Sequence, residues 1–287
     1  MAKADDLQHA SAEEFWERFE AVMGGPDGLM TYRYLGTQAD LATGGREGGM
    51  NIRRDLRNPA GGLLAAPLTI ALADAGGVHG DAVGVPAPVL TTLHMLDDGK
   101  DVTAIRVHSD GGGHAGRTLS FGGTARVLDA NNPDRVLAVT QGIAVQLAAA
   151  PAGYRYVDPG PGMPDSPNLL PLHVAFGARP RGDDWELPEL TQQIGSTSGS
   201  LHHGPTQIVL EAAAHQLASE HAATDQLQIE DWTVMYVARG KVGPFVTGGS
   251  VIGGSLGRYA VRMTLVDEGN QDRLVATALA VFRPSGS

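Results

Sequence analysis

Apolar and polar positions divide the chain into two similar series of predicted elements. An amphipathic helix is predicted at 11–23, where Ser11 and Glu14 form a capping-box pattern ahead of apolar residues at helical spacing. A second helix is predicted at 61–75, a run that is apolar on nearly all sides and is therefore expected to be buried. Alternating patterns predict strands at 31–41, 88–96, 102–109, 118–129 and 135–147.

The second series follows a segment rich in Pro and Gly, 151–188, which is predicted to be a linker without regular structure. A helix is predicted at 204–219, and strands are predicted at 190–194, 226–237, 245–252, 258–267 and 273–282. The expected domains are therefore residues 1–150, the linker 151–188 and residues 189–287.

The two series are related by an internal repeat. The run LLAAPLTIALAD, which begins at Leu63, aligns with LHHGPTQIVLEA, which begins at Leu201, 138 positions later. The last strand of each series keeps the same spacing, since RVLAV begins at Arg135 and RLVAT begins at Arg273. Agreement at both ends of each series indicates a duplicated unit.

Each unit is thus expected to be of the α+β class, with a central apolar helix wrapped by an antiparallel sheet. A helix that is apolar on all sides must be enclosed, so the sheet has to curl around it.

Composition narrows the classes of function. The net charge is −11 and no Lys/Arg cluster is present, which argues against nucleic acid as a partner. The absence of cysteine excludes disulfides and thiolate chemistry. No apolar run is long enough to span a bilayer, and the polar start of the chain does not match a signal peptide. We therefore expect a cytoplasmic protein without a membrane partner.

The order of elements, and the patterns at the starts of the two central helices, resemble the phenylacetyl-CoA thioesterase-like branch of hotdog proteins. The resemblance covers about residues 31–147 and 190–283. It implies a tandem, or double, hotdog in which both units of a dimer lie in one chain. It also implies hydrolysis of an acyl-CoA or acyl-carrier thioester, with coenzyme A only as part of the substrate and no other cofactor.

Family members share a pattern like N-P-x-G-x-x-H-G-G, with a carboxylate nine residues after the His. Here the first unit has Asn58-Pro59-Ala60-Gly61 and places Asp74 at the carboxylate position, but has Ala65-Ala66 where His-Gly is expected. The second unit keeps His203-Gly204 but has Ala212 at its carboxylate position. The resemblance therefore implies one composite catalytic site from Asp74, His203 and Gly204, and a second site without an acid.

In a hotdog site of this kind, N–H groups at a helix start stabilise the developing oxyanion, and the carboxylate acts as base or nucleophile. Glu211 lies one position before the expected carboxylate, about 100° around the helix, and is predicted to pair with a partner on the surface or between the units. It is also a candidate for substrate contact or catalysis. Other candidates for substrate contact are Asn58, Thr91, Thr92, Ser198 and Ser200, although the two serines also suit a turn or a helix cap.

Two other functions remain open. A hotdog hydratase or dehydratase would need a Gly-Asp-x-Asn-Pro-x-His segment, but Arg57 precedes Asn58-Pro59. A binding module for an acyl ligand would explain the altered motifs. The Gly-x-Ser-x-Gly match at 253–257 is predicted to be a hairpin, since a strand follows it. No histidine spacing suits a metal site. A homodimer of the double unit is a possible assembly.

Overall fold

The computed structural model describes residues 11–24, 28–40, 47–77, 84–115, 120–149 and 160–286. Its first half contains α1 (Ala12–Gly24), α2 (Met30–Leu35), β1 (Gln38–Asp40), β2 (Glu47–Asn51), η3 (Arg54–Leu56), α3 (Ala65–Gly77), β3 (Gly84–Met95), β4 (Ala104–Ala115), β5 (Ser120–Asp129) and β6 (Asn132–Ala149). Its second half contains α4 (Leu172–Ala175), β7 (Arg179–Arg181), β8 (Asp184–Leu187), α5 (His203–Ala222), β9 (Leu227–Tyr236), β10 (Phe245–Ser255), β11 (Arg258–Asp267), η4 (Glu268–Asn270) and β12 (Arg273–Pro284).

All strands belong to one 12-stranded sheet with the order β1-β2-β4-β5-β6-β3-β9-β12-β11-β10-β8-β7, and its neighbouring strands are antiparallel. Read from the centre outward, the two halves of this order correspond strand by strand. The halves meet where β3 pairs with β9, and Thr92 lies opposite Thr233 there. The repeat in the sequence is therefore also a repeat in the sheet.

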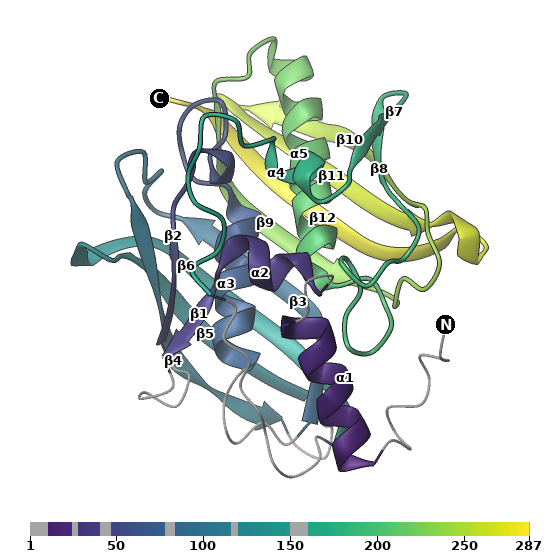
Figure 1. Cartoon of the computed structure of the whole chain (residues 1–287). Helices are drawn as coiled ribbons and strands as arrows, with labels where there is room; N and C mark the ends of the chain where they lie inside the picture. Colours follow the sequence, from purple (N-terminus) through teal and green to yellow (C-terminus); the bar gives the residue numbers. More distant parts are fainter. Residues whose placement is uncertain are drawn as a thin grey trace.

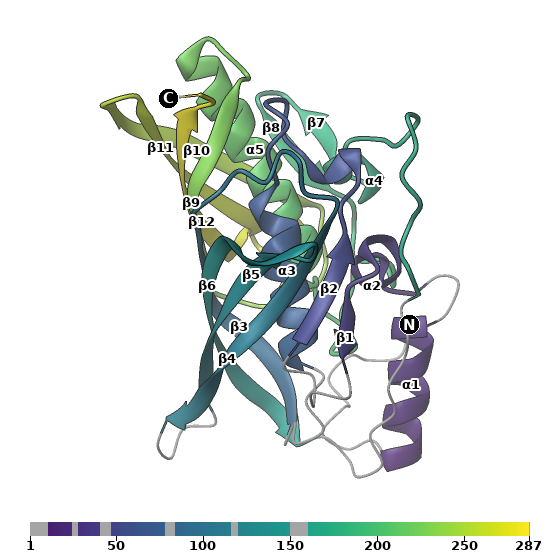
Figure 2. The same ribbon diagram turned by 90° about the vertical axis from the view of Figure 1, so that its left-hand side faces the viewer.

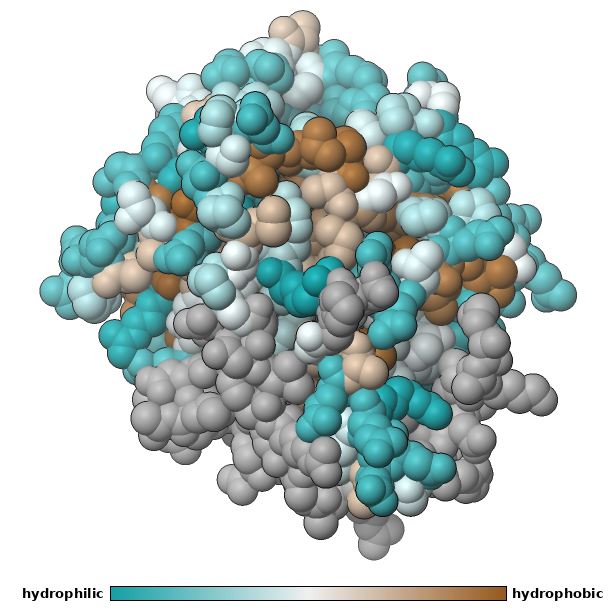
Figure 3. All heavy atoms as spheres, viewed as in Figure 1, coloured by the Kyte–Doolittle hydropathy of each residue, from teal (hydrophilic) through white to brown (hydrophobic). Residues whose placement is uncertain are grey.

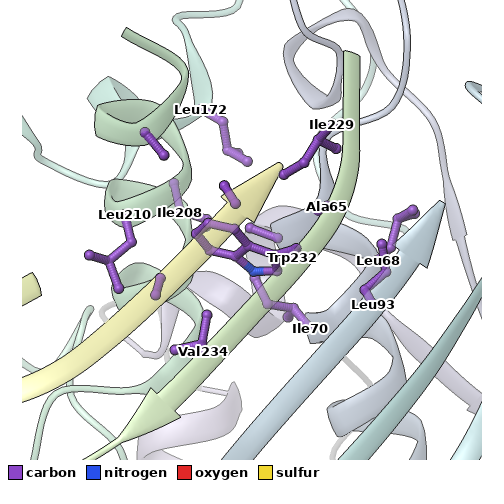
Figure 4. Close-up of a cluster of buried hydrophobic side chains, with 14 of the residues drawn as sticks. Ala65, Leu68, Ile70, Leu93, Leu172, Ile208, Leu210, Ile229, Trp232 and Val234 are labelled. Atoms are coloured by element: carbon purple, nitrogen blue, oxygen red, sulfur yellow. The ribbon is translucent and has the colours of Figure 1, made fainter. Parts of the chain in front are cut away.

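The two long central helices, α3 and α5, pack against each other inside the curve of this sheet (Figure 1). Viewed from the side, the central strands lie on one side of α3, and α1 and α2 lie on the other (Figure 2). Trp232 of β9 is fully buried among apolar side chains of both helices, including Ile70 and Ile208 (Figure 4). One continuous core thus serves both units.

The predicted helix at 11–23 is confirmed as α1, together with its capping box. The Ser11 backbone N–H donates to Glu14 Oε2 at 2.8 Å, and the Glu14 N–H donates to Ser11 Oγ at 3.2 Å. The predicted helices at 61–75 and 204–219 are confirmed as α3 and α5 with shifted ends. The match at 253–257 is a hairpin, as predicted, with Leu256 and Gly257 at positive φ in the turn between β10 and β11.

Three predictions of local structure are wrong. Residues 31–41 do not form one strand, because 30–35 are the helix α2, which ends at Gly36 in the left-handed conformation. No strand forms at 190–194. The predicted irregular linker contains α4, β7 and β8, and β8 pairs with β10. Pairing with a strand that lies far along the chain supplies β8 with hydrogen bonds that its local sequence does not reveal.

Among the residues that Figure 3 colours by hydropathy, polar side chains are widespread on this face, and apolar residues gather in patches between them. Within the described ranges, no helix is both long and apolar enough to cross a membrane.

Candidate composite site between the units

The loop before α3 is shaped by Asn58 and held by the second unit. Asn58 Oδ1 accepts a hydrogen bond from the Gly62 N–H at 3.1 Å, and Asn58 Nδ2 donates to Gln228 Oε1 at 2.9 Å. A side chain at Gly62 would collide with the Gln228 amide and displace it from its contact with Asn58. Asn58 therefore positions the start of α3, and its side chain is already occupied by these two contacts.

The carboxylate of Glu211 lies at the N-terminus of α3. Its Oε1 accepts from the Ala65 N–H at 2.7 Å and its Oε2 accepts from the Ala66 N–H at 2.7 Å. These N–H groups have no partner within their own helix and carry the positive end of the helix dipole, which favours a negative charge. Each unit supplies one half of this arrangement, because the N–H groups belong to α3 and the carboxylate belongs to α5.

Glu211 is only 3% exposed, and burial has a large effect on its charge. Loss of solvation raises the pKa of Glu211 to about 7, while hydrogen bonds from the Ala66 and Ala65 N–H groups act against this rise. A carboxylate with a pKa near neutrality can accept a proton from water and release it again at physiological pH.

The contact of Glu211 with Ala65 and Ala66 corrects the expectation that the site at the start of α3 has no acid. Ala212 occupies the position that the thioesterase pattern assigns to the carboxylate, but Glu211, one residue earlier, contacts Ala65 and Ala66. Glu211 does have the partner between the units that the sequence suggested, and that partner is the start of the other unit's central helix.

Side chains of His202 and Thr31 contact the N-terminus of α5 directly. His202 caps the helix, since its Nδ1 accepts from the Gly204 N–H at 3.2 Å, and the His202 and His203 rings lie 3.9 Å apart. Burial lowers the pKa of His203 to about 4, so this ring is neutral at pH 7. Thr31 of α2 packs directly on Gly204, where even a methyl group on the glycine would collide with it.

Asp74 belongs to α3, but its side chain lies outside the described residues. Its predicted combination with His203 and Gly204 therefore stays a prediction.

Ser198 and Ser200 form a turn before α5. Their hydroxyl oxygens lie 3.1 Å apart, and both contact the Ser196 hydroxyl, at 2.8 and 3.2 Å. Arg239 donates to the Ser198 carbonyl. The turn suggested by the sequence is confirmed, but the residue that caps α5 is His202.

Thr91 and Thr92 lie on β3 at the junction of the units. Thr91 is buried and is paired in the ladder with Val234 of β9, while Thr92 is half-buried opposite Thr233. The Thr92 carbonyl accepts from the Thr140 hydroxyl at 2.7 Å.

A buried polar cluster at the contact between the helices was not anticipated from the sequence. Gln207 Oε1 accepts from Trp232 Nε1 at 3.0 Å and from Thr69 Oγ1 at 2.6 Å. The available signal was a glutamine in an otherwise apolar stretch of α5, four residues from both His203 and Glu211.

Among the described residues, no group of three or more His, Asp or Glu side chains could hold a metal.

Comparison with solved structures identifies the fold. A conserved protein of unknown function with a hot dog fold from Alicyclobacillus acidocaldarius matches with a TM-score of 0.58 and 11% identity, over 90% of this chain and 98% of that one. The acyl-CoA thioesterase II TesB2 from Mycobacterium marinum matches with a TM-score of 0.56 and 13% identity, over 90% and 99% of the two chains.

The 12:0-ACP thioesterase from Umbellularia californica matches with a TM-score of 0.53 and 14% identity, over 83% of this chain and 94% of that one. No protein-family profile matches the sequence, and no curated protein matches it. The structural likenesses establish that this chain has the hotdog fold.

Proposed function

We propose that this chain is a double hotdog that hydrolyses acyl-CoA or acyl-carrier-protein thioesters at the composite site made by Glu211 and the start of α3. The observation that carries the proposal is the buried Glu211 carboxylate, which accepts hydrogen bonds from the Ala65 and Ala66 N–H groups of the other unit. The site thus combines a base whose pKa is close to 7 with the donors that an oxyanion needs.

In the proposed reaction, the thioester carbonyl oxygen takes over one N–H at the start of α3 from the Glu211 carboxylate. Glu211 then accepts a proton from a water molecule, and the water oxygen bonds to the carbonyl carbon. The negative charge that develops on the carbonyl oxygen is held by the helix start. The carbon–sulfur bond breaks, the acid is released, and the proton on Glu211 passes to the leaving thiolate.

The sequence resemblance implies a second location for this chemistry, at the start of α5, where Asp74 would act together with His203 and Gly204. Two observations favour the Glu211 location. Its acid and its N–H donors are in direct contact, whereas the approach to Gly204 is filled by Thr31 and the Gly204 N–H is bonded to His202.

Hydrolysis is supported over hydration or simple binding by the named activities of the structural neighbours, which are an acyl-CoA thioesterase and an acyl-ACP thioesterase. The two neighbours differ in the thiol carrier, so both carriers belong in the test.

The test measures release of free thiol from acyl-CoA and acyl-carrier-protein esters that span short to long and aromatic acyl groups. Glu211→Gln keeps the size of the side chain but cannot accept a proton from water, and we expect it to lower kcat at least about 100-fold. Glu220→Gln is the matched control, because Glu220 is an exposed carboxylate at the far end of the same helix.

Asp74→Asn decides between the two locations. Full activity in Asp74→Asn together with loss in Glu211→Gln would support the site proposed here. The reverse result would move the chemistry to the start of α5, and absence of turnover on every ester by the unaltered protein would refute hydrolysis.

A further inference from the structure

The amide of Gln207 is held in one orientation. Trp232 Nε1 can only donate, so the Gln207 atom that it contacts must be the oxygen. The Thr69 hydroxyl reaches the same oxygen at 2.6 Å. The amide nitrogen therefore points away from Trp232, and rotating the amide would place two donors against each other.

The Gln207 Nε2 has no hydrogen-bond partner in the described part of the chain, although Gln207 is only 1% exposed. The hydroxyl oxygen of Tyr236 is also buried and also lacks a hydrogen-bond partner among the described residues. Thr91 and Gln207 are the polar side chains beside this hydroxyl and oppose the rise that burial causes in the pKa of Tyr236, but neither makes a hydrogen bond of normal geometry with it.

Two buried polar groups without a hydrogen bond of normal geometry are unusual in a folded protein, because each loses bonds to water without full replacement. The position of these two groups indicates what they could bind. Gln207 lies four residues from Glu211 and four from His203, so all three project from the same side of α5. An acyl chain attached at either proposed location would pass Gln207 if it extended along the contact between the central helices.

We propose that Gln207 Nε2 and the Tyr236 hydroxyl bind an oxygen substituent on the acyl chain, so that the preferred substrates are thioesters of hydroxy- or oxo-acyl groups. This inference rests on the proposed hydrolysis. An oxygen on the chain would accept from both donors, whereas an unsubstituted chain would leave both unpaired and would also displace any water that satisfies them.

The experiment compares kcat/KM for pairs of acyl-CoA esters that have the same chain length, with and without a hydroxyl or oxo group, scanned along the chain. For at least one position of the substituent, we expect the unaltered protein to favour the oxygenated ester by at least about tenfold. In Tyr236→Phe we expect that ratio to fall by at least about fivefold.

Tyr236→Phe is suited to this test because the hydroxyl that it removes makes no hydrogen bond of normal geometry in the described part of the chain, so we expect the melting temperature to stay the same or rise. Tyr259→Phe is the matched control on β11 of the same unit, and it should leave the preference unchanged.

Active protein that shows no preference for oxygenated chains, or keeps its preference in Tyr236→Phe, would overturn the inference and leave the proposed hydrolysis standing. The first of these results would mean that the two donors bind water. Absence of turnover on every ester would instead overturn the proposed hydrolysis, and this inference with it.

Discussion

Thr69 of α3 and Gln207 of α5 are 138 residues apart in the sequence and in direct contact, with 2.6 Å between Thr69 Oγ1 and Gln207 Oε1. The same separation relates the two copies of the repeat. Equivalent positions of the two units therefore meet each other, which places the pseudo-twofold axis of the chain at this contact. Glu211 reaches the start of α3 one helical turn farther along α5.

Gln207→Leu should destabilise the protein because it leaves Trp232 Nε1 buried without an acceptor. We expect a loss of about 1–3 kcal/mol in the free energy of unfolding, measured with urea. The exposed residue Gln226 provides the control, and Gln226→Leu should change stability by less than about 0.5 kcal/mol. In a Trp232→Phe background the cost of Gln207→Leu should shrink, and equal costs in both backgrounds would contradict the role of this bond.

Glu211 should make stability depend on pH in a defined direction. Its pKa is about 7 in the folded protein against an ordinary value of 4.5, so the folded state binds the proton more tightly than the unfolded state. Stability should therefore fall as pH rises from about 4.5 to 7, by on the order of 3 kcal/mol. Glu211→Gln should lose this pH dependence of the free energy of unfolding, whereas Glu220→Gln should keep it. Identical profiles of stability against pH for the unaltered protein and both variants would show that Glu211 titrates normally.

The titration of Glu211 should also appear in the pH dependence of kcat/KM. If deprotonated Glu211 is the base, kcat/KM should rise with pH and level off above about pH 7, where the carboxylate is ionised in the free protein. The measurement is a series of initial rates on one acyl-CoA ester between pH 5 and 9. A flat profile across neutrality would argue against Glu211 as the base.

Thr31 and Gly204 should be coupled in stability. Gly204→Ala places a methyl group against Thr31, and we expect it to cost about 1–3 kcal/mol through overpacking. Thr31→Ala removes the two side-chain atoms closest to that methyl group, so the double variant should lose less than the sum of the single variants. Additive losses would mean that α2 does not press on the start of α5.

The sequence by itself determined the repeated α+β unit, the two central helices and most of the strands. These features follow from local periodicity, since apolar residues at helical spacing and alternating residues in strands are set by the geometry of each element alone. The helix at 61–75 could be identified because a run such as LLAAPLTIALA has no polar side to expose. The same local information failed at 31–41, where α2 forms, and at 179–187, where β7 and β8 pair with each other and β8 extends the sheet beside β10.

Only the tertiary structure decided which carboxylate meets which helix start. The family spacing pointed to positions 74 and 212, and one residue of difference turns a side chain about 100° around a helix. Whether Glu211 or Ala212 faces Ala65 depends on how α3 and α5 cross, which is fixed by packing between residues about 140 positions apart. The raised pKa of Glu211 and the unpaired amide nitrogen of Gln207 follow from that crossing as well, because burial is a property of the assembled core and not of the local sequence.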